Sequence, residues 1–168
     1  MPIPLILFFA VILPFLIVET IRSGYNERQL RKQGAIEPAG DPWGPIAVIY
    51  TGGFIAMALE GWARGGATQQ WMTAGLLLFT LAKIIKFWAV KTLGPRWSFR
   101  ILVLPGAPLV SGGPYRYMTH PNYVGVFGEF AGSAVMMNAP VAGVLVALSF
   151  FYFLRKRIAV EERALGIQ

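Results

Sequence analysis

Charged residues divide the chain into long stretches that are almost entirely apolar. Three stretches contain no Asp, Glu, Lys or Arg, and a fourth contains one acidic residue, Glu129; they are residues 2–18, 42–59, 65–82 and 121–154. A helix that crosses the hydrocarbon core of a bilayer needs roughly 20 such residues. The pattern therefore predicts a chain built of membrane-spanning helices.

The fourth stretch is too long for one crossing. At about 1.5 Å per residue, a single helix over residues 121–154 would measure about 50 Å. Asn138, Ala139 and Pro140 lie near its middle and favour a turn, which predicts a tight hairpin of two helices. We therefore expect an all-α integral membrane protein with about five transmembrane helices, at about residues 2–20, 43–62, 68–90, 121–137 and 140–158.

The basic residues gather in alternate connections between these predicted spans. Segment 22–41, segment 91–120 and the tail after residue 154 each hold four Lys or Arg, whereas the two intervening connections hold only Arg64. Basic connections remain in the cytoplasm under the positive-inside rule. This rule predicts that the N-terminus lies outside and the C-terminus in the cytoplasm, and it requires an odd number of spans.

The composition excludes several classes of protein. The chain has 168 residues, of which 55% are hydrophobic and 14% charged, with a net charge of +7. Disordered and ordinary soluble domains are less apolar, and no basic run suits nucleic acid. The absence of cysteine excludes disulfides, zinc–thiolate sites and a Cys nucleophile, and one His makes no multi-His metal site. No internal repeat is visible, so we expect one membrane domain over residues 1–168.

Several charges fall inside or beside the predicted spans. Glu129 lies about 12 Å along the fourth helix, where an ionisable group is costly and is a functional hypothesis by default. The alternative is a carboxyl that is held neutral or is paired with Lys83 or Lys86 of the third helix. These lysines more often extend to the headgroups than take part in chemistry. Glu19 and Glu60 are expected to close their helices at the membrane interface.

The segment 97–123 is apolar but cannot form a regular span. Seven Pro and Gly residues interrupt it, namely Pro105, Gly106, Pro108, Gly112, Gly113, Pro114 and Pro121. Irregular backbone near a membrane is tolerated where protein or a water-filled cavity satisfies its polar groups. The segment therefore predicts a folded cytoplasmic loop that closes a pocket, with an ordinary interfacial connection as the alternative.

The chain after the last span carries charges on a predicted helix. No breaker occurs before Gly166, so we expect a cytoplasmic tail helix over residues 155–166. Arg157 and Glu161 are four residues apart and share a face of this helix. Taken alone, the spacing favours a solvated helix end with an ion pair between these two side chains.

Three motifs in this order resemble one known family. They are Gly113-Pro114-Tyr115-Arg116-Tyr117, then His120-Pro121-Asn122-Tyr123 with Gly125, and, after the predicted hairpin turn, Arg157-Ile158 and Glu161-Glu162 with Leu165. Their spacing from Trp97 to Leu165 resembles the isoprenylcysteine carboxyl methyltransferases, a family of integral membrane enzymes. Asn26-Glu27-Arg28, Leu30 and Gly34-Ala35 are similar to short bacterial members, which implies the bacterial inner membrane.

The resemblance implies an S-adenosylmethionine pocket at the cytoplasmic face, built by the loop before the hairpin and the helix after it. The implied cofactor contacts are Ala107, Pro108, Leu109, Val110, Tyr115, His120, Pro121, Asn122, Tyr123 and Glu161. Arg157 matches the family's substrate-binding arginine. These roles make physical sense, because a carboxylate suits the cofactor's ammonium, aromatic faces favour cations and an arginine fork binds an oxyanion.

The methyl acceptor is expected to be a lipid that enters from the bilayer. A carboxylate such as that of a prenylcysteine is ionised at neutral pH, whereas a phenol benefits from a general base. Glu129 is a candidate catalytic base if it faces the pocket, and His120 is a second candidate. The segment from Trp97 to Tyr123 resembles bacterial relatives encoded with type III polyketide synthases, which implies O-methylation of a phenolic or alkylpyrone lipid.

One departure from the family keeps other functions open. Thr119 stands where the family usually has Arg directly before His-Pro, so a cation is missing unless Arg116 replaces it. The alternatives are phospholipid N-methylation, NADPH-dependent reduction of a lipid, and a non-catalytic membrane protein with a degenerate site. The partners expected from the sequence are S-adenosylmethionine, a lipidic substrate and membrane lipids, without nucleic acid or metal.

Overall fold

The computed structural model describes residues 3–166 and consists of five long helices. They are α1 (Ile3–Lys32), α2 (Trp43–Ala63), α3 (Gln69–Leu93), α4 (Pro121–Met137) and α5 (Pro140–Leu165). Two short 3-10 helices, η1 (Gly94–Arg96) and η2 (Gly113–Arg116), lie in the connection between α3 and α4. Within residues 3–166 there is no strand, and the predicted all-helical fold is confirmed.

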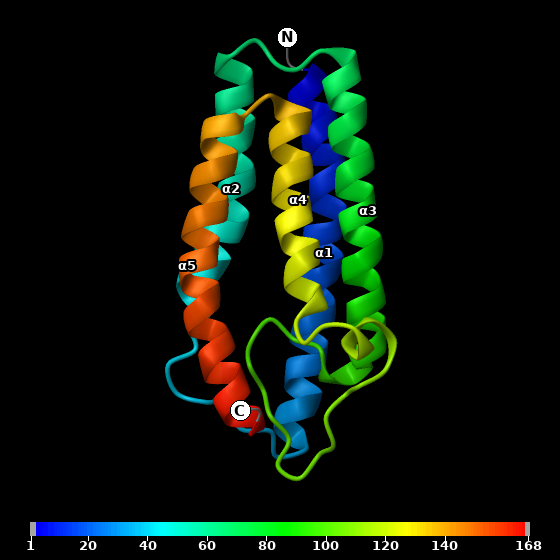
Figure 1. The fold of residues 1–168 in the computed structure, drawn as a ribbon, viewed down its shortest axis with the longest axis vertical. Coiled ribbons are helices and arrows are strands. Elements are labelled where there is room, and N and C mark those ends of the chain that lie inside the picture. Colours follow the sequence, from blue (N-terminus) through cyan, green and yellow to red (C-terminus); the bar gives the residue numbers. More distant parts are fainter. Residues whose placement is uncertain (1–2, 167–168) are drawn as a thin grey trace.

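The five helices run side by side along the long axis of the molecule (Figure 1). Three of them are long and apolar enough to cross a membrane within the described residues, namely Leu5–Lys32, Trp43–Ala63 and Gln69–Arg96. Helix α4 has only 17 residues, and the second half of α5 is charged. The chain is an integral membrane protein, while the crossing of α4 and α5 stays a prediction.

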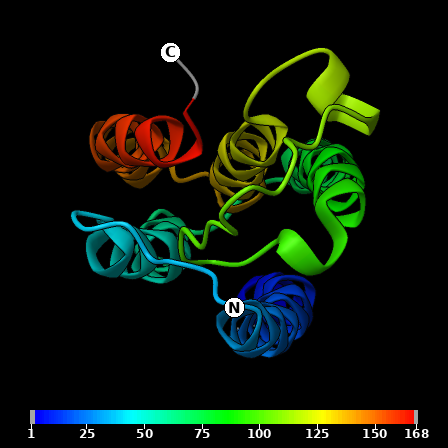
Figure 2. The same cartoon turned by 90° about the horizontal axis from the view of Figure 1, so that it is seen from below.

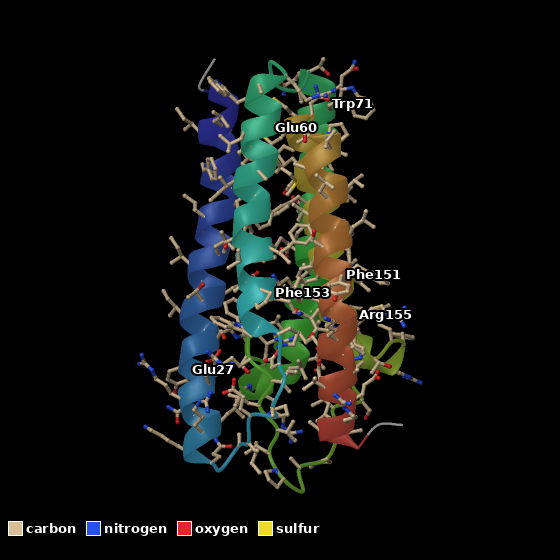
Figure 3. The ribbon with its side chains drawn as sticks, turned by 90° about the vertical axis from the view of Figure 1, so that its left-hand side faces the viewer. Glu27, Glu60, Trp71, Phe151, Phe153 and Arg155 are labelled. Atoms are coloured by element: carbon tan, nitrogen blue, oxygen red, sulfur yellow. The ribbon has the colours of Figure 1, made fainter. Side chains whose placement is uncertain are left out.

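Most predicted helix boundaries agree with the structure, and the hairpin is where it was expected. Asn138 adopts a left-handed conformation with φ 57°, and Pro140 begins α5 two residues later. The free backbone N–H groups at the start of α5 are partly satisfied by Glu60 of α2, which accepts from Val141 at 3.2 Å and from Ala142 at 2.6 Å. Glu60 thus lies at the hairpin end of the bundle, opposite the end marked by Glu27 (Figure 3).

The prediction that the first helix ends near Glu19 is wrong. Helix α1 continues without a break to Lys32 and is 30 residues long. Glu19 lies within this helix and not at its end. Its charge is tolerated inside the bundle because two lysines of α3 neutralise it. Pro2, included in the predicted first span, lies outside the described residues. The predicted tail helix, by contrast, is the continuous end of α5.

Helices α3 and α4 pack with their backbones close together. Gly125, Gly128 and Gly132 of α4 form a strip that faces α3; a Cβ on Gly128 would lie 2.6 Å from the Cβ of Ala82. A Cβ on Gly132 would lie 2.6 Å from the backbone nitrogen of Phe79. Small residues allow such close approach between membrane helices. The seam fixes the start of α4, and therefore the loop that precedes it.

The basic segments all lie at one end of the bundle. Figure 1 shows the end of α1, the α3–α4 connection and the end of α5 together at the bottom, opposite the N-terminus. Ile36 and Val103 exchange two backbone hydrogen bonds there and join the α1–α2 connection to the α3–α4 connection. The gathering of the basic segments at one end is the arrangement that the charge pattern predicts.

Candidate active site

A cavity of about 630 Å³ lies in the bundle at the end where the connections gather. All five helices contribute to its wall, together with the segment between residues 96 and 111. Figure 2 shows this segment running across the ends of the helices. The volume is within the range of small-molecule sites. The irregular loop therefore closes a pocket, as its prolines and glycines predict.

Most of the candidate residues from the sequence line this one cavity. They are Ala107, Pro108, Leu109, Val110, Tyr115, His120, Asn122, Tyr123, Arg157 and Glu161. Thr119 lines it as well, whereas Arg116 does not. Pro121 and Glu129 are also outside the lining: Pro121 is buried in the first turn of α4, and Glu129 is buried two turns further along the helix.

Arg157 joins three parts of the chain at the cavity. Its guanidinium forms an ion pair with Asp41 at 2.7 Å and donates to the backbone oxygen of Phe99 at 2.6 Å. It also donates to the Tyr123 hydroxyl at 2.9 Å. Asp41 in turn accepts from the backbone N–H of Ile101 at 3.1 Å. The ionic partner of Arg157 is therefore Asp41, and the ion pair with Glu161 expected from helical spacing is not formed.

Glu161 is linked to Arg157 through a tyrosine. The Tyr123 hydroxyl donates to Glu161 at 3.1 Å while it accepts from Arg157, so Tyr123 lies between the two charges. A ring nitrogen of His120 lies 3.2 Å from the carboxylate of Glu162. The motif residues of α4 and α5 thus touch one another across the hairpin. The Glu161 carboxylate lines the cavity; no Lys or Arg among residues 3–166 forms an ion pair with it, and a ring nitrogen of His120 lies 3.9 Å away.

The wall around Asn122 suits a ligand with hydrogen-bond donors. The side-chain oxygen of Asn122 is buried and has no partner among the described residues. An acceptor left in this state is costly unless a ligand or a water molecule donates to it. Burial raises the pKa of the nearby Tyr115 hydroxyl, and the charge of Glu161 adds to the effect, so this hydroxyl stays protonated. Leu109 and Val110 add an apolar surface.

The membrane side of the cavity is mainly apolar. Leu16, Ile46, Val126 and Phe150 line it from four different helices. Its polar side chains are Thr20 of α1, Tyr50 and Thr51 of α2, and Lys86 of α3. The cavity therefore has a polar part near α5 and the loop, and an apolar part inside the bundle, which matches a ligand pair of unequal polarity.

A buried cluster of four charges adjoins this apolar part. Glu129 is fully buried and lies 3.0 Å from Lys83 and 3.2 Å from Lys86, which confirms the pairing considered from the sequence. The same lysines contact Glu19 at 2.8 and 2.7 Å. They do not extend to headgroups, because both are buried. Glu19 is part of this cluster and not an interfacial residue, contrary to prediction.

Two functional candidates had no recognisable signal in the sequence. Asp41 and Tyr50 reach the site from segments that precede the motifs by tens of residues, whereas the backbone oxygen of Phe99 belongs to the loop that was predicted to close the pocket. Within residues 3–166, no three His, Asp or Glu side chains are near enough to hold a metal ion. The polar groups of the cavity are those that would bind an organic cation and a small polar head.

Known sequences now identify the relatives of this chain. The model of the isoprenylcysteine carboxyl methyltransferase (ICMT) family matches residues 75–167, more than half of the chain. The chain belongs to the ICMT family. Membership places it among the methyltransferases that depend on S-adenosylmethionine, and the matched residues include α4, α5 and the loop that closes the cavity.

Individual relatives differ in how much of the ICMT-family chain they share. A Bacillus subtilis protein, "Uncharacterized protein YpbQ", is 31% identical over 83% of both chains. "Protein-S-isoprenylcysteine O-methyltransferase A" of Arabidopsis thaliana and the mouse protein-S-isoprenylcysteine O-methyltransferase are each 33% identical. They match 58% and 56% of this chain, which in turn spans only 51% and 35% of their lengths. No solved structure matches the chain.

Proposed function

We propose that this protein transfers a methyl group from S-adenosylmethionine to an oxygen atom of a lipidic acceptor. The observation that carries the proposal is the cavity, which joins the polar motif residues of the ICMT family to the apolar interior of the bundle. Because the basic connections lie at the same end, we place the cavity at the cytoplasmic face. The acceptor would reach it from the bilayer, without leaving the membrane.

The residues present fit the methyl donor. Glu161 would hold the ammonium of the cofactor, because it is the one carboxylate in the cavity lining of the described residues and no Lys or Arg among them forms an ion pair with it. The unpartnered oxygen of Asn122 would accept a hydrogen bond from it, and Leu109 and Val110 would cover its apolar surface. When bound, the cofactor supplies an activated methyl group on a sulfonium. The chain's own contribution is to position both reactants and exclude water.

The charges around the cavity favour a neutral hydroxyl acceptor, such as a phenolic or pyrone lipid. Arg157, the residue that would bind an acceptor oxyanion, is already neutralised by Asp41 at 2.7 Å. Lys86 is neutralised by Glu19 and Glu129. A carboxylate acceptor would have to compete with these buried carboxylates, whereas a hydroxyl group would not.

A carboxylate acceptor is the second candidate. The named relatives from plants and mammals carry S-isoprenylcysteine in their names, and the family model covers the segment that contains Arg157. In this case the acceptor carboxylate would replace Asp41 on the guanidinium. The two candidates therefore differ in whether the Asp41–Arg157 pair opens during turnover.

The first test is binding of the cofactor to the purified full-length protein in detergent. We expect calorimetric titration to detect S-adenosylmethionine and not NADPH. Replacing Glu161 with Gln should weaken binding at least tenfold, because a charge-assisted contact with the ammonium is lost. Glu27→Gln is the control, since Glu27 accepts from Ser23 in α1 and does not line the cavity.

The second test identifies the acceptor. Membranes that contain the protein, incubated with radiolabelled S-adenosylmethionine and a lipid extract, should yield a labelled lipid ether. A labelled methyl ester would favour the carboxylate candidate instead. The proposal is wrong if the protein binds NADPH and not S-adenosylmethionine, or if Glu161→Gln and the wild type bind the cofactor equally.

A further inference from the structure

Tyr50 connects the cavity to the buried charge cluster. Its hydroxyl donates to Glu129 at 2.5 Å and accepts from the Lys86 ammonium at 3.0 Å. Tyr50 and Lys86 line the cavity, whereas Glu129, Glu19 and Lys83 do not. Tyr50 is therefore the point at which a ligand in the apolar part of the cavity meets a fully buried carboxylate.

The hydrogen-bonding state of Tyr50 restricts what it can bind. A phenol oxygen has one hydrogen and two lone pairs. The hydroxyl hydrogen is donated to Glu129, and one lone pair accepts a hydrogen bond from Lys86. The second lone pair has no partner within residues 3–166. Tyr50 can therefore accept one more hydrogen bond but cannot donate one. This capacity matches an acceptor that carries a hydroxyl hydrogen, and it does not match a carboxylate.

We propose that Tyr50 is a catalytic residue that binds the hydroxyl hydrogen of the acceptor and passes its proton to Glu129. The inference rests on the proposed methyl transfer to a lipid oxygen. As the acceptor oxygen bonds to the methyl carbon, the methyl–sulfur bond breaks and its electron pair stays on sulfur. The acceptor's proton moves to Tyr50 while the proton of Tyr50 moves to Glu129. The positive charge lost by the sulfonium thus reappears as this proton.

Protonation of Glu129 would leave both lysines of the cluster with a carboxylate partner. Two lysines and two glutamates balance one another, and both lysines lie closer to Glu19, at 2.8 and 2.7 Å, than to Glu129, at 3.0 and 3.2 Å. If Glu129 becomes neutral, each ammonium keeps a contact with Glu19. Glu129 acts only through Tyr50, so its role is to position the Tyr50 hydroxyl and to hold the proton.

Ligand binding to the wild-type protein tests the hydrogen-bond requirement without any substitution. We would titrate the full-length protein in detergent with para-dodecylphenol, para-dodecylanisole and para-dodecylbenzoate. The phenol should bind roughly tenfold more tightly than the other two, since it alone donates to Tyr50. Equal or tighter binding of the benzoate or the anisole would overturn the inference.

A single substitution then assigns the preference to Tyr50. Tyr50→Phe keeps the ring and should abolish the preference for phenol over anisole. Tyr152→Phe should retain it, because the Tyr152 hydroxyl accepts from Lys156 on the exposed side of α5. The inference is wrong if Tyr50→Phe keeps the preference while its thermal midpoint and its binding of S-adenosylmethionine match those of the wild type.

Turnover provides a readout that a purely structural role would not change. Tyr50→Phe and Glu129→Gln should both lower the kcat for the alkylphenol. A nitro-substituted alkylphenol, already ionised at neutral pH, should restore much of it because no proton has to be removed. Equal loss with both phenols would contradict proton transfer through Tyr50. A wild type that binds the phenol selectively but never binds S-adenosylmethionine would refute the proposed function alone.

Discussion

Arg157 shows how one side chain can serve both the site and the fold. Its three nitrogens contact a carboxylate, a backbone oxygen and a hydroxyl from three separate segments. The sequence predicted a role for Arg157 through its motif but gave no indication of Asp41, which lies 116 residues away. Asp41 lies between Gly40 and Pro42 in a short connection, and this local sequence is typical of an ordinary turn. Pairing over such a distance depends on tertiary packing, which no local pattern encodes.

The Asp41–Arg157 pair predicts strong coupling between two substitutions. Asp41→Asn or Arg157→Gln alone leaves a buried charge without its partner, and each should destabilise the protein by about 3 kcal/mol. The double variant should lose clearly less than the sum, with a coupling of at least about 1 kcal/mol. Chemical unfolding in detergent of the two single variants and the double variant measures this coupling.

The half-exposed pair of Arg100 and Glu37 is the matched control for this cycle. It starts from the same α1–α2 connection and reaches the α3–α4 connection at 2.6 Å, but the Arg100 side chain is 36% exposed. Its coupling should be about 0–1 kcal/mol, because water screens the attraction. Additive losses for Asp41 and Arg157 would show that their contact does not stabilise the fold.

At the scale of helices, the sequence predicted the number and type of the elements well, but it did not predict the contacts between the helices. The uncharged stretches and the turn at Asn138 located α2, α4 and α5 within a few residues. Glu19 was misjudged because a charge in an apolar stretch suggests an end, unless its partners on another helix are known. The glycines of α4 were also not recognised as a contact strip, since their spacing has meaning only beside α3.

The α3–α4 seam predicts a site-specific sensitivity to one methyl group. Gly132→Ala would place a Cβ 2.6 Å from the backbone nitrogen of Phe79, which cannot move without shifting α3. We expect a loss of about 1–3 kcal/mol in unfolding free energy. Gly52→Ala in α2 is the control, because no atom lies within 4 Å of its added Cβ. It should be neutral or stabilising, as alanine favours helix.

These two variants also separate the effect of helix packing from that of helix propensity. Thermal unfolding in the same detergent gives the unfolding midpoint of each variant. Similar midpoints for Gly132→Ala and Gly52→Ala would mean that α3 and α4 do not pack as closely as described. A selective loss in Gly132→Ala should also weaken binding of S-adenosylmethionine, because the seam positions the first turn of α4, where Asn122 and Tyr123 line the cavity.

At the scale of the molecule, charge and cavity are concentrated at the same end. The three basic segments lie at the end where the connections close the cavity. The opposite end carries the hairpin turn and the short α2–α3 turn (Figure 1). The net charge of +7 is therefore mainly a signal of orientation. Arg157 and Lys86 are exceptions, because buried carboxylates neutralise them beside the cavity.

The absence of cysteine makes the predicted topology directly testable. We would place single cysteines at three exposed positions, as Gln33→Cys and Thr68→Cys in two connections and Val141→Cys in the first turn of α5, and label bacterial cells with an impermeant maleimide. Thr68→Cys and Val141→Cys should react in intact cells, and Gln33→Cys only after permeabilisation, whereas the wild type should never react. If Val141→Cys, like Gln33→Cys, reacts with the maleimide only after permeabilisation, α4 does not cross the membrane. In that case the hairpin of α4 and α5 would enter from the cytoplasmic face, and the cavity would lie beside a re-entrant pair.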